Sequence, residues 1–585
     1  MMAEIESSEG NRMPETENRN IVLLCVLAVF IGVIGGIGAW VFRLLIGFFH
    51  NLLFLGQFSL HYDANIHTPT NVWGPGIILV PVIGAVGVAW LVKTFAPEAK
   101  GHGVPEVMDA IYYNEGRIRP VVVIVKSLAS ALSIGSGGAI GREGPIIQIG
   151  ATFGSVMGSW VAMPTRQRVI LMAAGAGAGI AATFNAPLGG ILFAVELLLV
   201  SISAQSIFLV ATSTIMATYI GRQLLGTSPS FDVPALQIPA FGVGDNWGLI
   251  LFLPFGLLCG LAGTAFVRAI YWAEDKFDAM PGNYYSRHMI GMALVGVMIY
   301  LMQLYAGHFY VQGVGYATIL DVLVGALSDP WFLLLLFGLK MVATCLTLGS
   351  GASGGVFSPS LFMGATLGAA FGSIMHMIFP ALEVGIPVFA IAGMAAMIGS
   401  TTGAIFTSVV MLAEMTGDYD TVLPTVLATA VAYAVRRKLS PASIYTLKLN
   451  RRGHSVPEGL SSALLAARRI RDIMTHNFTV LKEGEALPDT PGTVIWTANG
   501  SVIKTEQRFA ERNNPEAALT VGTPVNFAFI AEDASLIEAL QTLEQQGADV
   551  ALVSTAPQGK TAADIVGVVT ETELSRALKN VAALH

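Results

Sequence analysis

The chain has 585 residues, of which 54% are hydrophobic and only 12% are charged, and its formal net charge is −7. A soluble domain carries about a quarter of charged residues, so residues 21–450 are too apolar for a water-soluble domain. No basic tract suits nucleic acid, and Cys25, Cys259 and Cys345 lack the spacing of a metal site or a disulfide framework. Composition therefore predicts a membrane protein, with a soluble domain starting near residue 465.

The N-terminal segment, residues 1–20, is a polar and mostly acidic tail without the basic start of a secretory signal. The apolar run over residues 21–49 exceeds the roughly 20 residues that span a bilayer. Basic residues gather beyond the last apolar run, at Arg436, Arg437, Lys438, Arg451, Arg452, Arg468, Arg469 and Arg471. Since positive charge favours the cytoplasmic side, we expect a multi-pass protein of the inner (plasma) membrane with both termini in the cytoplasm.

The apolar runs of the membrane domain do not predict transmembrane helices of uniform length. A long apolar run over residues 247–271 contrasts with short apolar pieces that Gly-rich loops interrupt at residues 135–144 and 349–358. Backbone broken at membrane depth must be buried in protein or line a polar cavity. Interrupted helices of this kind are typical of transporter binding sites.

The membrane domain also contains an internal repeat. The segments 135–145 and 349–359 align at a constant offset that matches Gly141 with Gly355 and Pro145 with Pro359. A second block, at a slightly larger offset, matches Glu196 with Glu414. The repeat predicts two related halves, around residues 75–225 and 285–440, with the site at their interface.

Three loops, at residues 101–105, 141–145 and 355–359, read as glycine, then proline, then an apolar helix. Proline suits the first helical position, and glycine lets the backbone approach a ligand closely. A helix N-terminus offers free N–H donors and a partial positive charge. Three such ends directed at one place would bind an anion weakly enough to release it, as conduction requires.

These loops resemble the signature of the CLC chloride channels and transporters. Gly141-Arg-Glu-Gly-Pro145 matches the most specific family motif, residues 355–359 fit its Gly-x-Phe-x-Pro motif, and residues 101–105 are similar to its Gly-Ser-Gly-Ile-Pro motif with two changes. Residues 185–190 and 443–449 also resemble family segments. The resemblance covers about residues 20–450. It implies an α-helical integral membrane domain over residues 21–452, with inverted halves of broken, tilted helices. It also implies a lipid-embedded homodimer that transports chloride or similar small anions and is not an enzyme.

The resemblance makes Glu143 the gating glutamate, whose carboxylate competes with the anion and can carry a proton. The residues themselves support this role, because an ionisable side chain at membrane depth is a functional candidate. The other anion ligands that the resemblance implies are the backbone N–H groups of Arg142, Glu143 and Gly144 at an outer site, those of Val356 and Phe357 at a central site, and the hydroxyl of Tyr445 on the inner side.

Two departures from the family pattern affect the expected transport. His102 replaces the usual serine, so either its imidazole donates to the anion or it turns away and only backbone, with Gly103, remains. The first alternative leaves a nitrate-preferring transporter open, since plant nitrate exchangers also depart from serine there. Leu197 replaces a proton-relaying glutamate that family exchangers often carry.

Because leucine cannot titrate, Leu197 favours a channel-like or weakly proton-coupled chloride pathway. The alternative is a proton-coupled Cl⁻/H⁺ antiporter, which the intact Glu143 and Tyr445 support. We interpret Glu196 and Glu414 as structural, hydrogen-bonded carboxylates. For Lys126 we expect an internal ion pair, because buried lysine needs a partner.

Beyond a linker at residues 453–467, residues 468–585 predict a small α/β cytoplasmic domain. Residues 471–475 resemble the start of a CBS-domain pair and residues 533–578 a full CBS repeat, whereas the first repeat is degenerate, because residues 480–520 lack a clear amphipathic helix. The resemblance puts Thr570 and Glu573 where an adenine nucleotide would bind. A dimerising domain without nucleotide remains the alternative, and no other cofactor or metal is expected.

Overall fold

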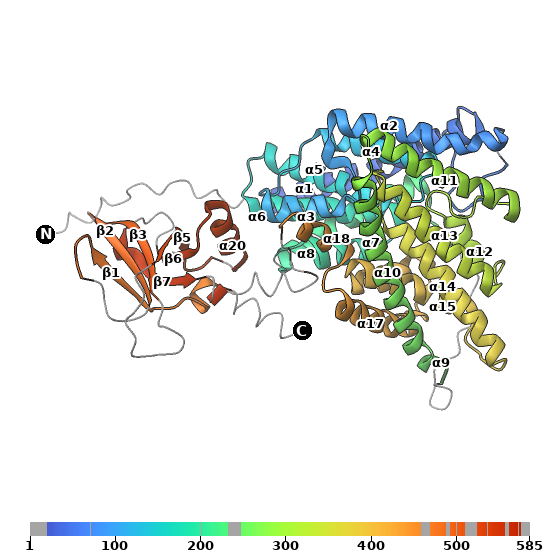
Figure 1. Cartoon of the computed structure of the whole chain (residues 1–585). Helices are drawn as coiled ribbons and strands as arrows, with labels where there is room; N and C mark the ends of the chain where they lie inside the picture. The colour runs from blue at the N-terminus through green and yellow to red at the C-terminus, as the bar shows by residue number, and fades with distance from the viewer. Residues whose placement is uncertain are drawn as a thin grey trace. The chain divides into compact units, whose positions relative to one another are not determined.

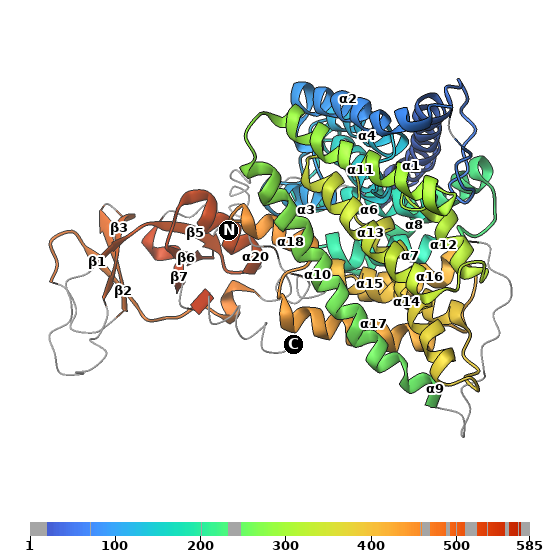
Figure 2. The same cartoon turned by 45° about the vertical axis from the view of Figure 1, so that its right-hand side comes forward.

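The structure is a computed structural model. It describes residues 20–574 apart from 71, 201, 232–246, 455, 457, 459–468, 487–491, 499, 509–522, 535, 556–560 and 571–572. Contacts divide the chain into two units, residues 1–199 with 203–459 and residues 200–202 with 460–585. The first unit is helical and the second is rich in strands (Figures 1 and 2).

The described residues of the first half of the helical unit form eight α-helices. They are α1 (Ile21–His50), α2 (Leu79–Phe95), α3 (Val104–Tyr113), α4 (Val121–Gly135), α5 (Glu143–Trp160), α6 (Thr165–Phe184), α7 (Pro187–Phe193) and α8 (Ala204–Leu225). A π-helical turn, η4 (Ala194–Leu198), prolongs α7, and another, η1 (Asn51–Leu55), prolongs α1. Short 3-10 turns, η2 (Gly74–Ile78) and η3 (Pro97–Ala99), precede α2 and α3.

The second half repeats this order of elements. It consists of α9 (Trp247–Ile250), α10 (Phe252–Ala279), α11 (Tyr284–Ala306), α12 (Tyr316–Leu323), α13 (Pro330–Gly349), α14 (Phe357–Ile378), α15 (Ile386–Thr402), α16 (Ile405–Thr416), α17 (Val422–Leu439) and α18 (Ile444–Arg451). Packing follows the repeat: α1 lies against α6 and α8, while α10 lies against α15 and α17. Likewise α5 packs on α6 and α14 packs on α15.

Glycine pairs lie at close helix crossings in both halves. A Cβ atom on Gly150 would lie 2.1 Å from the carbonyl oxygen of Gly175, and one on Gly364 would lie 2.3 Å from that of Gly393. These are the positions that the repeat relates, so any side chain there would separate α5 from α6 or α14 from α15. Each half therefore contains one glycine-mediated helix crossing of the same kind in its interior.

Eight helices in the described part of the chain are long and apolar enough to cross a membrane, and four shorter apolar helices accompany them. The helices at residues 165–184 and 386–402 are buried along nearly their whole length. Large apolar side chains such as Trp90, Trp160, Trp272 and Trp331 are exposed instead. Apolar residues on both the inside and the outside fit a protein that lies in lipid.

The part of the second unit that the structure describes forms two sheets. The first holds β1 (Phe478–Lys482), β2 (Gly492–Ala498), β3 (Ser501–Arg508) and β4 (Thr523–Val525), and the second holds β5 (Phe527–Ala531), β6 (Val550–Ser554) and β7 (Ile565–Thr570). In both, the first two strands are parallel and the next pair is antiparallel. The parallel crossover in the second sheet is α20 (Leu536–Gln546).

Short 3-10 turns, η5 (Ile470–Asp472) and η6 (Ala562–Asp564), lie outside the two sheets. The connection between β1 and β2 is too short for a helix like α20, in line with a first repeat that lacks a clear amphipathic helix. Residues 1–19 of the expected N-terminal tail, most of the 453–467 linker and residues 575–578 of the expected CBS repeat fall outside the described residues.

Candidate functional site

The three glycine-rich loops meet one another in the helical unit. Gly141 and Gly355 exchange two backbone hydrogen bonds, each with an N···O distance of 2.7 Å. The N–H of Gly101 donates to Ala352 O at 3.0 Å, and the N–H of Gly354 donates to Gly101 O at 3.2 Å. The loop before α14 therefore pairs with both of the others, and the repeat-related glycines lie at the junction of the two halves.

Glycine is required where the loops approach most closely. A Cβ atom on Gly144 would lie 2.0 Å from the carbonyl oxygen of His102. Gly103 has a φ of +86°, which residues other than glycine rarely adopt. A Cβ atom added to it would lie 2.7 Å from the carbonyl oxygen of Gly144. The motifs thus contain glycine because backbone contacts backbone at this point.

Two helix N-termini open onto the junction. Helix α5 begins at Glu143, directly after Arg142, and α14 begins at Phe357, directly after Val356. Within the described residues, no backbone acceptor is found for the N–H groups of Glu143, Gly144 or Phe357. Free N–H groups and the positive ends of two helices are available there for negative charge.

The carboxylate of Glu143 occupies this position. The side chain is buried, with 1% exposed. Its Oε1 accepts from the hydroxyl of Tyr316 at 2.6 Å, and its Oε2 accepts from the backbone N–H of Ser358 at 3.2 Å. The Ser358 hydroxyl also donates to Oε1. A side-chain carboxylate at the start of α14, held by three donors, stands where a free anion would bind.

His102 and Tyr445 are connected through Tyr271, which lies next to the His102 ring and bonds the residue that precedes Tyr445. His102 is buried and neither of its ring nitrogens has a hydrogen-bond partner among the described residues, with Nδ1 fully enclosed. Its ring is 6.3 Å from that of Tyr271, whose hydroxyl donates to Ile444 O at the start of α18. Tyr445 follows; it is buried, and its hydroxyl also lacks a partner within the described residues.

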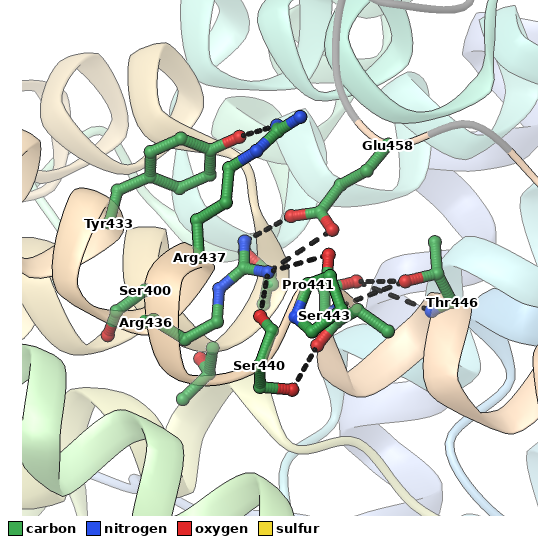
Figure 3. A network of polar contacts seen from close by, with 12 residues as sticks. Ser400, Tyr433, Arg436, Arg437, Ser440, Pro441, Ser443, Thr446 and Glu458 are labelled. Carbon is green, nitrogen blue, oxygen red and sulfur yellow. Dashed lines mark hydrogen bonds and ion pairs between the residues drawn. The ribbon is translucent and has the colours of Figure 1, made fainter. Parts of the chain in front are cut away.

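A buried arginine fixes the segment that leads into α18 (Figure 3). Arg436, fully buried at the end of α17, donates to Ser440 O at 3.3 Å and forms a two-pronged ion pair with Glu458. The next helix then starts with a capping box between Ser443 and Thr446. Since Tyr445 lies inside this box, the arginine and the cap together set where its ring enters the interior.

Lys126 corrects one expectation. It is fully buried, but its ammonium donates to the carbonyl oxygens of Ala99 at 3.0 Å and Gly101 at 2.8 Å rather than to a carboxylate. Lys340, at the equivalent position of the second half, donates to Val311 O at 2.9 Å and Gly313 O at 2.7 Å. Carbonyl groups suffice as partners because each buried ammonium has two of them within hydrogen-bond distance, which supplies the partners that a lysine needs at membrane depth.

Glu196 and Glu414 cap helices of the opposite half. Glu196 accepts from the N–H groups of Phe406 at 3.0 Å and Thr407 at 2.8 Å, at the start of α16. Glu414 accepts from the N–H groups of Leu188 at 3.0 Å and Gly189 at 2.8 Å, at the start of α7. These bonds agree with their interpretation as hydrogen-bonded structural carboxylates.

Two polar cavities flank the loop junction. One of about 170 Å³ is lined by residues that include Arg43, Asp63, Arg142, Arg222 and Tyr316. The other, of about 440 Å³, is lined by residues that include Lys100, Glu106, Tyr271, Glu274, Lys448 and Arg451. The first cavity has three arginines against one aspartate and would raise the local concentration of small anions. In the second, the basic side chains are balanced by Glu98, Glu106, Glu274, Asp275 and Asp278.

Tyr316 was missed by sequence reasoning. It stands at the same offset from His102 as Gly355 does from Gly141, and it follows Gly315, whose φ of +79° matches the +81° of Gly101. Extending the repeat to this loop would have found it. The signal was weak because Gly315 is not followed four residues later by the proline that the other three loops have.

In the second unit, Thr570 is the last residue of β7, and its N–H donates to the carboxylate of Glu573 at 3.0 Å. The Thr570 hydroxyl donates to the same carboxylate. The two residues that the CBS resemblance selects are therefore neighbours bonded to each other. A nucleotide bound there would have to compete with this pair for the Thr570 hydroxyl.

Comparisons with known proteins agree with the helical unit. Residues 83–437 match the family model described as voltage gated chloride channel. The H(+)/Cl(-) exchange transporter ClcA of Vibrio parahaemolyticus is 35% identical over 395 residues, which are 66% of this chain and 82% of that protein. ClcA of Yersinia pseudotuberculosis is 31% identical over 463 residues, covering 76% and 91% of the two chains.

Solved structures agree as well. The structure of a slow cyanobacterial Cl⁻/H⁺ antiporter is similar, with a TM-score of 0.63, 27% identity and coverage of 76% of this chain and 99% of that one. A eukaryotic CLC transporter has the same fold, with a TM-score of 0.63 and 18% identity over 94% of this chain and 98% of that one. The latter coverage extends into the second unit, whose small α/β architecture is compatible with a CBS-type domain.

The repeated halves, broken helices and helix N-termini around a buried carboxylate define a multi-pass membrane protein that transports anions. The chain belongs to the CLC family of voltage-gated chloride channels and transporters. The predicted family and fold class are confirmed, and the chain is a transporter rather than an enzyme.

Proposed function

We propose that this protein is a proton-coupled chloride antiporter in which Glu143 alternately blocks the anion pathway and carries a proton. The observation that carries the proposal is the buried Glu143 carboxylate, which accepts hydrogen bonds from Ser358 and Tyr316 at the start of α14. A carboxylate in an anion's place leaves that place when it is protonated or displaced. One group then links anion and proton movement.

The names of the relatives support exchange. The Vibrio and Yersinia proteins are called H(+)/Cl(-) exchange transporters, and the cyanobacterial structure is that of a Cl⁻/H⁺ antiporter. Residues 141–145 retain the complete motif on which the proposal rests. We therefore favour exchange over the channel-like pathway that Leu197 alone suggests.

The test is proton movement during chloride efflux from liposomes that contain the purified full-length protein. A chloride gradient drives the flux, an ionophore clamps the voltage, and external pH is recorded. We expect protons to move uphill at a fixed ratio to chloride. Chloride flux without proton movement would overturn the antiporter and leave a passive pathway gated by Glu143.

A channel-like pathway remains the second candidate because of one observation. Leu197 is buried and cannot titrate, and the adjacent Glu196 is engaged by Phe406 and Thr407. A proton from the cytoplasm would then need water or another route to reach Glu143. Nitrate is a further candidate anion, because His102 replaces the family serine. Flux measured with nitrate in place of chloride in the same liposomes shows which of these two anions the protein prefers.

We also propose that the protein works as a homodimer in the plasma membrane, with both termini in the cytoplasm. The basic residues at the end of α17 and in α18 support this orientation. Cysteine-accessibility labelling at position 453 in intact cells tests it, because an external reagent should not reach that position. Labelling from outside would reverse the assignment.

A further inference from the structure

Tyr316 is the buried aromatic residue in direct contact with the Glu143 carboxylate. It is the first residue of α12 and is 1% exposed. Its hydroxyl lies 2.6 Å from Glu143 Oε1 and 3.0 Å from the Ser358 hydroxyl. The hydroxyl has one proton, and the negatively charged oxygen is the stronger acceptor, so that proton is directed to Glu143.

Two contacts that do not involve the hydroxyl hold the ring in place. The ring of Phe231 packs edge to face on it, with centroids 5.3 Å apart and an interplanar angle of 74°. The guanidinium of Arg142 lies over it at 5.1 Å from the centroid. The hydroxyl is therefore aimed at Glu143 by packing and a cation–π contact rather than by its own hydrogen bond.

Tyr316 also lies between the Glu143 carboxylate and a cavity. Tyr316 lines the 170 Å³ cavity together with Arg43, Arg142 and Arg222. A side chain that contacts this cation-lined cavity and the carboxylate at once lies where an arriving anion would have to displace Glu143.

Resting on the proposed role of Glu143 as the gate, we propose that Tyr316 is a positioning residue that latches the gate shut. Its hydroxyl donates a charge-assisted hydrogen bond to the carboxylate while the carboxylate occupies the anion's place. When Glu143 leaves, this bond is lost, so the hydroxyl stabilises the closed state relative to the open one. An anion must compete with the latched carboxylate and therefore binds with reduced apparent affinity.

The test uses Tyr316→Phe in the full-length protein, because phenylalanine keeps the ring and its contacts with Phe231 and Arg142 but removes the donor. Chloride affinity of the purified protein is measured by isothermal titration calorimetry, and the half-saturating chloride concentration and maximal rate are measured in liposomes. A hydrogen bond to a charged group contributes roughly a factor of ten or more to an equilibrium. We expect the apparent chloride dissociation constant and the half-saturating concentration to fall about tenfold.

The decisive comparison repeats Tyr316→Phe in a Glu143→Ala background. With no carboxylate to latch, the substitution should change chloride affinity less than about twofold, which a general packing defect would not predict. The control is Tyr310→Phe, also in the second half, whose ring contacts the rings of His67, His308 and Phe332 rather than Glu143. This substitution should leave chloride affinity unchanged.

An equal shift with and without Glu143 would overturn the latch, and so would weaker chloride binding in the Glu143→Ala background, which would make Tyr316 a ligand of the anion. These outcomes are separate from failure of the proposed gate. In that case Glu143→Ala itself would leave proton coupling intact.

Discussion

The two halves of the helical unit share a backbone plan but differ in the side chains that face the loop junction. Glu143, at the start of α5, corresponds to Phe357 at the start of α14, and His102 corresponds to Tyr316. The first half supplies the titratable carboxylate, and the second half supplies the donors that hold it, Ser358 and Tyr316. The repeat therefore builds the site, whereas the gate exists because the two halves carry different side chains at these positions.

Features that only support the fold remain equivalent. Lys126 and Lys340 each bind two loop carbonyls, and Glu196 and Glu414 each cap a helix of the opposite half. Substitutions at equivalent supporting positions should therefore have equal effects, while substitutions at the divergent positions should not.

The largest effect is expected at the divergent position 143. Glu143→Ala should abolish proton movement while chloride flux continues, because no titratable group remains at the start of α14. Coupled liposome measurements of chloride and pH check this, with Glu414→Gln as the control that keeps coupling. Proton-coupled flux that persists in Glu143→Ala would contradict the assigned role.

Removal of either buried lysine should destabilise the protein by a similar amount. Lys126→Met and Lys340→Met each remove a buried ammonium that donates to two loop carbonyls, and the loss of these two hydrogen bonds costs about 3 kcal/mol. The free energy of unfolding is measured by denaturant titration of the purified protein, with the exposed Lys93→Met as control. Values that differ by more than about 1 kcal/mol would show that the halves are not equivalent supports.

The glutamate caps should show a smaller, equally symmetric effect. Glu196→Gln and Glu414→Gln should each cost about 1 kcal/mol of stability, because the amide is a weaker cap than the carboxylate. The ratio of protons to chloride should stay unchanged in both. If Glu196→Gln alone lowered that ratio, Glu196 would relay protons and its likeness to Glu414 would be structural only.

The smallest effect is expected at His102, which differs from its counterpart Tyr316 in the second half. His102→Ser should change the chloride-to-nitrate flux ratio about threefold, the size of one ordinary hydrogen bond, because the ring nitrogens have no protein partner among the described residues. His376→Ser, which removes a ring that bonds Val384 O, is the control. An unchanged ratio would mean that the imidazole does not face the anion.

The sequence by itself determined the membrane character, the two halves and the loops that carry Glu143. These are local signals: apolar runs, glycines where backbones touch, and a proline at a helix start. The same information assigned structural roles to Glu196 and Glu414. It also identified residues 533–578 as resembling a full CBS repeat, and the described part of that range contains α20, β6 and β7.

Only the tertiary structure decided which side chains meet. Tyr316 and Ser358 reach Glu143 across 173 and 215 residues of chain, and Lys126 binds carbonyls rather than the carboxylate expected of it. No local pattern encodes such pairings, since they depend on how two repeated halves dock at Gly141 and Gly355. The repeat predicts where equivalent residues stand, but the packing of one half on the other selects the donors for the gate.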